Sequence, residues 1–444
     1  MKRTQILIFT CLLILSMAAS AMAGGPPPKD LLTGYFTEVN EVARSVQFIK
    51  NPDDTPRTLF LNEEMNLSDI RLDKKMMITL DTHAGEGVMG SISIMFMEMT
   101  LTKIGSLLLI GLIGGLLSGF IGSGGAFVMT PAMMSLGAPG AIAVASNMCH
   151  KFPKAMVGAF KRHKYGQVDI KLGLVMAVTA IIGVEIGIKI QKFILNSYGN
   201  AGSNLYVSVV FVAVLVIVGF IVARDAYKLS KGSGEATTPK LATALMKLNV
   251  WPMMEFKVAK VRISAWVTVP VGLFTGMLAA TIAVGGFVGV PGMIYVIGAS
   301  AMIASATELV VAFIMGCYGS AQWAISGLVD IRMTLLILAG SLFGVQLGAL
   351  GTTYVKDHII KIVMASVMLI VAVSRGAMIP GYLVDVGMIS AVDPQTIAML
   401  DSVSFWALIL ALGSAGGLIV VFMIKGMMQA KRDEKRNVLE AAHG

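Results

Sequence analysis

The stretch GLLSGFIGSGGAFVMTP, residues 115–131, is apolar enough to lie in a membrane, but glycines interrupt it near its middle and a proline follows. A backbone break inside the hydrocarbon is tolerated only where protein or a water-filled cavity covers it, because freed amide and carbonyl groups otherwise cost several kcal/mol each. The stretch therefore predicts a broken helix beside a cavity in a membrane protein.

The composition of the whole chain agrees with this interpretation. Of its 444 residues, 56% are hydrophobic and 14% are charged, which is too apolar for a soluble protein of this length. The net charge of +9 does not indicate nucleic-acid binding, because the lysines and arginines fall in loops between apolar spans, where they report orientation. We expect a multi-pass membrane protein with no nucleic-acid partner.

The first 23 residues have the layout of a signal peptide. A positively charged start precedes an apolar run that ends near Met17, and Ala21, Met22 and Ala23 form a small-residue cleavage site. The alternative is an uncleaved first transmembrane helix, for which the apolar run is short. We therefore expect residues 1–23 to be removed and the mature chain to begin outside the cytoplasm.

Residues 24–90 form a polar segment that we expect to fold as a small extracytoplasmic β domain. Short alternating runs such as TGYFTEVN and RTLFLN are separated by turn-rich pieces such as NPDDTP. The order of the runs resembles the small five-stranded barrels of bacterial envelope proteins, some of which bind copper. Candidate ligands for such a soft metal are Met76, Met77, His83, Met89 and Met95. The alternative, which we favour, places them in the strand core and near the membrane.

Four short motifs of the membrane part occur twice and in the same order, which indicates an internal duplication. The two copies run over residues 104–223 and 263–375. The pairs are GLLSG at 115–119 and GLFTG at 272–276, GGAFVMTP at 124–131 and GGFVGVP at 285–291, GQVDIKL at 166–172 and GLVDIRM at 327–333, and GVEIG at 183–187 and GVQLG at 344–348.

Loop charges decide the topology. A single crossing by the interrupted stretch of residues 104–136 would place the basic linker of residues 224–262 on the outer face, against the positive-inside rule. A stretch that returns to its entry side puts this linker and the basic tail of residues 425–444 in the cytoplasm, and the acidic loop of residues 376–402 outside. We therefore predict an all-α polytopic membrane protein with two inverted repeats containing re-entrant helices. A final span covers residues 403–424.

Hairpins that enter from opposite sides would bring their glycines to the midplane. Ser123, Gly124 and Gly125 of the first hairpin, with Gly285 and Gly286 of the second, would present backbone amides and helix N-termini, which favour an anion. The alternative is that these glycines only permit close packing of helices.

At these motifs the sequence resembles the sulfite exporter TauE/SafE family of anion transporters over residues 104–375. The resemblance rests on a glycine-rich segment ending in proline, a helix with small polar residues and a Gly-x-Val-Asp turn, each present twice. It implies transport of a small anion, sulfite or an organosulfonate, across the bacterial inner membrane. It implicates Gly124, Gly125, Pro131, Ser146, Asn147, Gly166 and Asp169 in the first copy, and Gly285, Gly286, Pro291, Thr307, Glu308, Gly327 and Asp330 in the second. Glu308 departs from the pattern because the first copy has Asn147 there, and the β domain is an addition.

Ionisable residues inside apolar spans are costly and are therefore candidates for function. Ser146, Asn147, His150 and Lys151 form a polar wall on one helix, which we expect to face the glycine hairpin and bind the anion. Glu308 would repel an anion unless it were protonated, so it is the candidate proton carrier.

Simpler roles remain open for several charged residues. Lys151 and Lys154 can reach the aqueous interface with their long side chains. Glu185 and Lys189 are spaced for a local ion pair, and Asp169 and Asp330 for caps of the helices that follow them.

These observations predict a secondary transporter of small anions, with proton coupling as a further hypothesis. The sequence contains no nucleotide-binding loop and no arrangement of nucleophile and base, so we expect neither enzymatic activity nor a cofactor. The expected partners are a small anion and the lipid bilayer, and a homo-oligomer is left open. Two alternatives are an envelope metal-binding or sensing protein that uses the β domain and is anchored by the membrane part, and a channel with paired hairpins.

Overall fold

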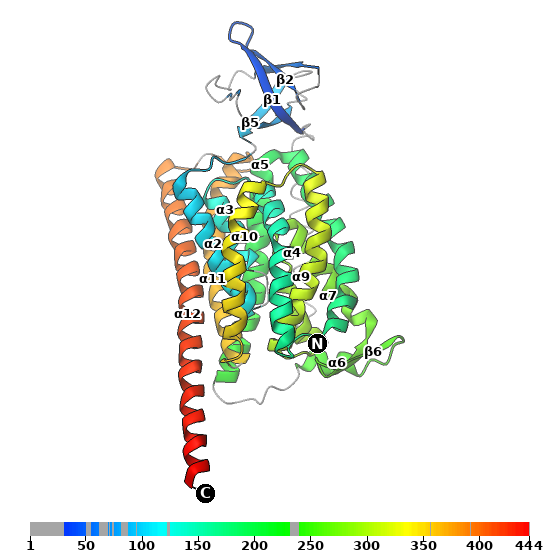
Figure 1. Cartoon of the computed structure of the whole chain (residues 1–444). Coiled ribbons are helices and arrows are strands. Elements are labelled where there is room, and N and C mark those ends of the chain that lie inside the picture. The colour runs from blue at the N-terminus through cyan, green and yellow to red at the C-terminus, as the bar shows by residue number, and fades with distance from the viewer. Residues whose placement is uncertain are drawn as a thin grey trace.

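The computed structural model describes residues 31–49, 55–61, 70, 72, 75–80, 88–94, 96–121, 125–230, 239–355, 357–390 and 392–443. The predicted signal peptide, Ser123 and Gly124 lie outside these ranges, as do His83 and Met95. The described chain is mostly helical and carries a small β barrel at one end of the helical body (Figure 1). We call this end the barrel side.

The N-terminal β segment is a closed barrel in the strand order β1-β2-β3-β5-β4. Alternating residues such as Phe36, Phe48 and Ile78 point inward, because successive side chains of a strand face opposite sides. Met76 and Met89 belong to this apolar core and are buried, which agrees with the packing role favoured for them. The strands are β1 (Leu31–Asn40), β2 (Ser45–Ile49), β3 (Arg57–Leu61), β4 (Lys75–Leu80) and β5 (Val88–Ile94).

Seven helices of the described chain are long and apolar enough to cross a membrane. They are α2 (Leu101–Ile121), α5 (Ile170–Ser230), α7 (Ala265–Ile282), α9 (Ala301–Ile325), α10 (Ile331–Gly351), α11 (Asp357–Asp385) and α12 (Pro394–His443). The long α5 is two helices joined at Gly199, whose φ of 63° is a left-handed conformation that favours glycine. The chain is therefore a multi-pass membrane protein.

The remaining elements are shorter or more polar. They are α3 (Ala126–Ser135), α4 (Gly140–Lys164), α6 (Lys240–Met246), β6 (Met253–Phe256), β7 (Val261–Ser264), α8 (Gly286–Gly292) and the π-helix η2 (Met293–Ile297). Helix α6, the β6–β7 hairpin and the C-terminal end of α12 lie at the end opposite the barrel (Figure 1). We call this end the linker side.

Each interrupted stretch folds back on itself. In the first, Gly125 at the start of α3 packs on the Gly114 carbonyl in the middle of α2, and Gly137, just after α3, lies beside Lys103 near the start of α2. In the second, Gly285 packs on the carbonyl of Thr275. We call α2–α3 hairpin 1 and α7–α8–η2 hairpin 2.

Helices of the first copy pack mainly on helices of the second. Gly111, Gly115 and Gly119 of α2 contact Ile337, Ser341 and Val345 of α10, so these two helices run parallel. The first half of α5 and α7 also run parallel, through Gly183 and Gly187 against Leu273 and Met277. Glycine at each contact lets the backbones approach closely, which is how helices associate in lipid.

Helices α4 and α9 cross in the centre and run antiparallel. Met148 of α4 contacts Gly319 and Ser320 of α9, whereas Gly158, farther along α4, contacts Leu309, which precedes them on α9. Gly158 and Gly319 occupy equivalent positions of the two copies. The contacts of Gly158 with Leu309 and Val345 are matched by those of Gly319 with Met148 and Val184.

Candidate functional site

Six of the predicted site residues lie on α4 and α9, and the chain buries all six. Ser146, Asn147, His150 and Lys151 of α4, and Thr307 and Glu308 of α9, have no exposed surface. Lys154 is also fully buried, so the alternative that the two lysines reach the aqueous interface is wrong. Burial of so many polar groups is costly unless each finds a partner.

Asn147 joins α4 to hairpin 1. Its amide nitrogen donates to the carbonyl of Ala126 at 3.1 Å and to the Thr130 hydroxyl at 2.6 Å, both in α3. The amide oxygen, Oδ1, has no hydrogen-bond partner. Asn147 thus contacts the segment that follows the glycine break, as predicted for the polar wall, and keeps one acceptor free.

Glu308 is the equivalent residue of the second copy and lies against hairpin 2. Its carboxylate rests on Gly289 of α8, where a Cβ atom would overlap Oε2 and lie 2.7 Å from the carboxyl carbon. Neither carboxylate oxygen has a hydrogen-bond partner. A side chain at position 289 would therefore displace this carboxylate from its present place.

Lys151 and His150 complete a cluster of unsatisfied polar groups. The Lys151 ammonium has no hydrogen-bond partner and lies near enough to the Glu308 carboxylate to interact with it electrostatically. His150 Nδ1 lies 2.7 Å from the Asn147 carbonyl oxygen, which assigns the proton to Nδ1, and Nε2 has no partner. Buried groups of this kind are expected to bind water, an ion or a substrate.

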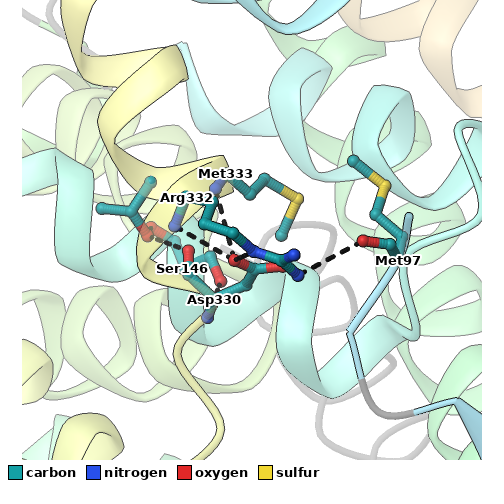
Figure 2. A network of polar contacts seen from close by, with 6 residues as sticks. Met97, Ser146, Asp330, Arg332 and Met333 are labelled. Carbon is teal, nitrogen blue, oxygen red and sulfur yellow. Dashed lines mark hydrogen bonds and ion pairs between the residues drawn. The ribbon is translucent and has the colours of Figure 1, made fainter. Parts of the chain in front are cut away.

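Ser146 and Thr307 make reciprocal contacts between the copies. The Ser146 hydroxyl accepts from the Asp330 amide at 2.9 Å, and the Thr307 hydroxyl accepts from the Asp169 amide at 3.1 Å. Figure 2 shows the first contact, in which the Asp330 carboxylate also binds Arg332, and Arg332 reaches the Met97 carbonyl. We call these contacts the Ser146–Asp330 latch and the Thr307–Asp169 latch.

The two aspartates have the capping roles proposed for them. The Asp330 carboxylate accepts from the amides of Arg332 and Met333, and that of Asp169 accepts from the Leu172 amide. Asp169 also accepts from the amides of Val258 and Ala259 at 3.0 Å each. The Thr307–Asp169 latch is therefore tied to the loop of the β6–β7 hairpin.

The glycines begin the second helices of the hairpins. Gly125 precedes α3, and Gly285 and Gly286 lie at the start of α8. Gly125 and Gly285 are each pressed against the first helix of their own hairpin, so the close-packing interpretation applies to both. Their contact with an anion remains a prediction, and Ser123 and Gly124 lie outside the described residues.

Sequence analysis missed two features. Phe127 and Phe287, the second residues of α3 and α8, pack edge to face with 4.0 Å between ring centroids. Arg162 is buried and donates to the carbonyls of Gly119 and Phe120 at the end of α2. The Phe present in both glycine motifs was a sequence signal for the Phe127–Phe287 contact. No such signal existed for Arg162, because it has no counterpart in the second copy.

Glu185 and Lys189 lie apart from the cluster. Their charged groups are 3.5 Å apart on α5 and both side chains are partly or largely exposed, so the local ion pair is the correct interpretation. A group of three or more His, Cys, Asp or Glu residues suited to a metal ion is absent from the part of the chain that the structure describes.

Comparisons with known proteins agree with this architecture. The profile of the family described as sulfite exporter TauE/SafE matches residues 107–375. The probable membrane transporter protein YjnA of Bacillus subtilis (strain 168) is 22% identical over 266 residues, which is 60% of this chain and 96% of the relative. The probable membrane transporter protein YdhB of the same organism is 22% identical over 253 residues, or 56% and 89% of the two chains. No solved structure matches.

Proposed function

We propose, because this chain belongs to the sulfite exporter TauE/SafE family, that its membrane part is a secondary transporter of a small anion, sulfite or an organosulfonate. The family is one of membrane transporters, and the two Bacillus relatives are described in the same terms. The substrate class and the mechanism below are proposals for this chain.

The proposed transport unit consists of two inverted repeats with re-entrant hairpins. This is supported by the antiparallel crossing of α4 and α9, equivalent helices of the two copies. It is also supported by the turn of each interrupted stretch back beside its own first helix. Transporters of this architecture bind their substrate near the midplane, between the repeats.

One observation carries the proposed site. Lys151 and Glu308 are fully buried, attract each other and make no hydrogen bonds, and unpartnered atoms of Asn147 and His150 lie on the same helix as Lys151. A buried charge without a close partner costs several kcal/mol, so the presence of Lys151 and Glu308 at these positions needs a reason. An anion that binds the Lys151 ammonium supplies one.

We propose that the anion and Glu308 compete for Lys151. When the anion binds, Glu308 loses its counter-ion and takes up a proton, so that the cluster never carries two uncompensated negative charges. The glycine amides of the hairpins are additional donors for the anion, and His150 Nε2 becomes one when the imidazole is protonated. This exchange couples one anion to one proton.

Alternating access then requires the two ends of the site to open in turn. The Ser146–Asp330 latch and the Thr307–Asp169 latch lie near opposite ends of the antiparallel pair α4 and α9. We propose that one latch opens while the other stays closed, which is the behaviour of two repeats that rock about a fixed site.

The proposed orientation places the barrel outside the cytoplasm in the inner membrane. The described residues of the basic linker and of the C-terminal tail lie together on the linker side (Figure 1), which supports a cytoplasmic location for both. The metal-binding alternative is not proposed, because Met76 and Met89 pack in the barrel core.

Uptake by proteoliposomes tests the proposed function. Labelled sulfite, sulfate, taurine and sulfoacetate would be offered with and without an imposed proton gradient, to wild type and to Asn147→Ala. We expect saturable, gradient-dependent uptake of at least one of these anions and its loss in Asn147→Ala. Flux that does not saturate would indicate a channel, and no flux of any of the four would refute the proposed substrate class.

A further inference from the structure

Another buried cation, Arg375, lies away from the central cluster. Arg375 of α11 has no exposed surface, and no ion pair found in the described part of the chain includes it. Its Nη2 donates to the hydroxyls of Ser135 at 2.9 Å and Ser404 at 3.1 Å. Nε and Nη1 have no hydrogen-bond partner.

The described groups that contact Arg375 are neutral hydroxyls. Ser374 donates to the Ser404 carbonyl at 2.8 Å, and the Tyr382 phenol lies close enough to interact with the guanidinium. The carboxylates of Asp385 and Asp401 interact with Tyr382. A buried guanidinium that contacts only hydroxyls and makes no ion pair with a carboxylate is strongly unfavourable unless an anion joins it.

The chemistry of these groups selects an oxyanion. The planar guanidinium matches the oxygens of sulfite, sulfate, phosphate or a sulfonate, and neighbouring hydroxyls can donate to the oxygens that remain. Ser135 is exposed, so the site adjoins the surface of the described chain, from which a small free anion would enter.

The place of Arg375 in the fold relates it to the central site. Ser135 is the last residue of α3, and Ala126 and Thr130, which hold Asn147, lie in the first half of the same helix. Ten residues of α-helix span about 15 Å. The Arg375 group therefore lies about one short helix away from the cluster, at the end of hairpin 1 on the barrel side.

We propose that Arg375, Ser135 and Ser404 form a second anion site, which holds a small free oxyanion on the barrel side before it reaches the central cluster. Helix α12, which supplies Ser404, follows the region matched by the family profile, so this site depends on a helix beyond that region. That this site binds the same anion as the one transported rests on the proposed function. Anion binding at Arg375 does not depend on it.

Equilibrium binding of labelled sulfite, with sulfate and phosphate as competitors, tests this site in the purified full-length protein. We expect two sulfite equivalents per chain in wild type, one in Arg375→Gln, one in Lys151→Met and none in the double variant. Arg432→Gln, which removes an exposed arginine of the tail, is the control and should still bind two sulfite equivalents. In uptake, Arg375→Gln is expected to raise KM at least about tenfold and Arg375→Lys to restore part of the loss.

The outcomes separate the two proposals. Unchanged stoichiometry and KM in a folded Arg375→Gln protein would overturn the second site. Loss of binding in Arg375→Gln with no effect of Lys151→Met would support it while refuting the central site. If Arg375→Gln fails to fold, Ser404→Ala replaces it. This variant is expected to bind the second sulfite equivalent severalfold more weakly. A phospholipid that copurifies with wild type but not with Arg375→Gln would assign the site to a lipid phosphate and overturn the proposal.

Discussion

The rings of Phe127 and Phe287 pack edge to face, with 4.0 Å between centroids and 64° between ring planes. Both side chains are fully buried, and each is the second residue of the returning helix in its hairpin. Hairpins from the two copies therefore meet at this aromatic pair, which adds about 0.5–1.5 kcal/mol to the burial of two large apolar side chains.

The pair is expected to stabilise the contact between the hairpins. Phe287→Ala should lower the free energy of unfolding by about 3–5 kcal/mol, because it removes a fully buried ring. Thermal unfolding in detergent would measure the change. Phe193→Ala, which removes a ring that is 65% exposed, should have little effect, and equal shifts in both variants would contradict the role of the pair.

The latches are expected to contribute individually to stability. Ser146→Ala leaves the buried amide of Asp330 without its acceptor, and Thr307→Val does the same to Asp169. Each should cost about 1–3 kcal/mol, whereas Ser146→Thr and Thr307→Ser should retain most of the stability. Ser305→Ala is the control, because its hydroxyl bonds only to the Met302 carbonyl within its own helix. A Ser146→Ala protein as stable as this control would rule the latch out.

We expect the placement of the Glu308 carboxylate to depend on glycine at position 289. In Gly289→Ala the new methyl group would overlap that carboxylate, so we predict a loss of uptake of tenfold or more. Overpacking typically costs about 1–3 kcal/mol in stability, and Glu308→Ala should relieve the overlap. The stability of the Gly289→Ala, Glu308→Ala double variant should therefore recover without recovery of transport. Gly105→Ala, which meets nothing within 4 Å, is the control, and similar uptake in the two glycine variants would contradict this placement of Glu308.

Asp169 is expected to hold the β6–β7 hairpin in place. Asp169→Ala removes the acceptor of the Val258 and Ala259 amides, and each such bond to a charged group contributes about 1.5–3 kcal/mol. Trypsin should then cut after Lys257 or Lys260 at least about tenfold faster. Asp393→Ala, at an exposed site, is the control. Protease added only on the barrel side should not reach these lysines, and cleavage from that side would overturn the proposed orientation.

Sequence patterns predicted part of this structure well. The broken glycine stretches, the β barrel and the caps made by Asp169 and Asp330 all follow from local residue types. Hydropathy alone would omit α4 from the membrane spans, because its lysines and histidines lower the average. The duplication identifies α4 nevertheless, since its apolar counterpart α9 is a candidate span.

The partners of buried arginines were beyond sequence analysis. Arg162 and Arg375 lie in or next to apolar segments, where an arginine usually extends to the interface. Their burial depends on the helices that pack over them, which local sequence does not specify. The latches were missed for the same reason, because each joins residues far apart in the chain.

The most direct test of the central claim is sulfite uptake under an imposed proton gradient by Lys151→Met and Glu308→Gln, beside Lys189→Met and Glu185→Gln. The control pair carries the same side chains on α5, where Lys189 is largely and Glu185 partly exposed. We predict that Lys151→Met abolishes uptake, that Glu308→Gln abolishes its dependence on the proton gradient, and that both controls match wild type. Gradient-dependent uptake that survives in Lys151→Met and Glu308→Gln would show that the anion does not compete with Glu308 for Lys151.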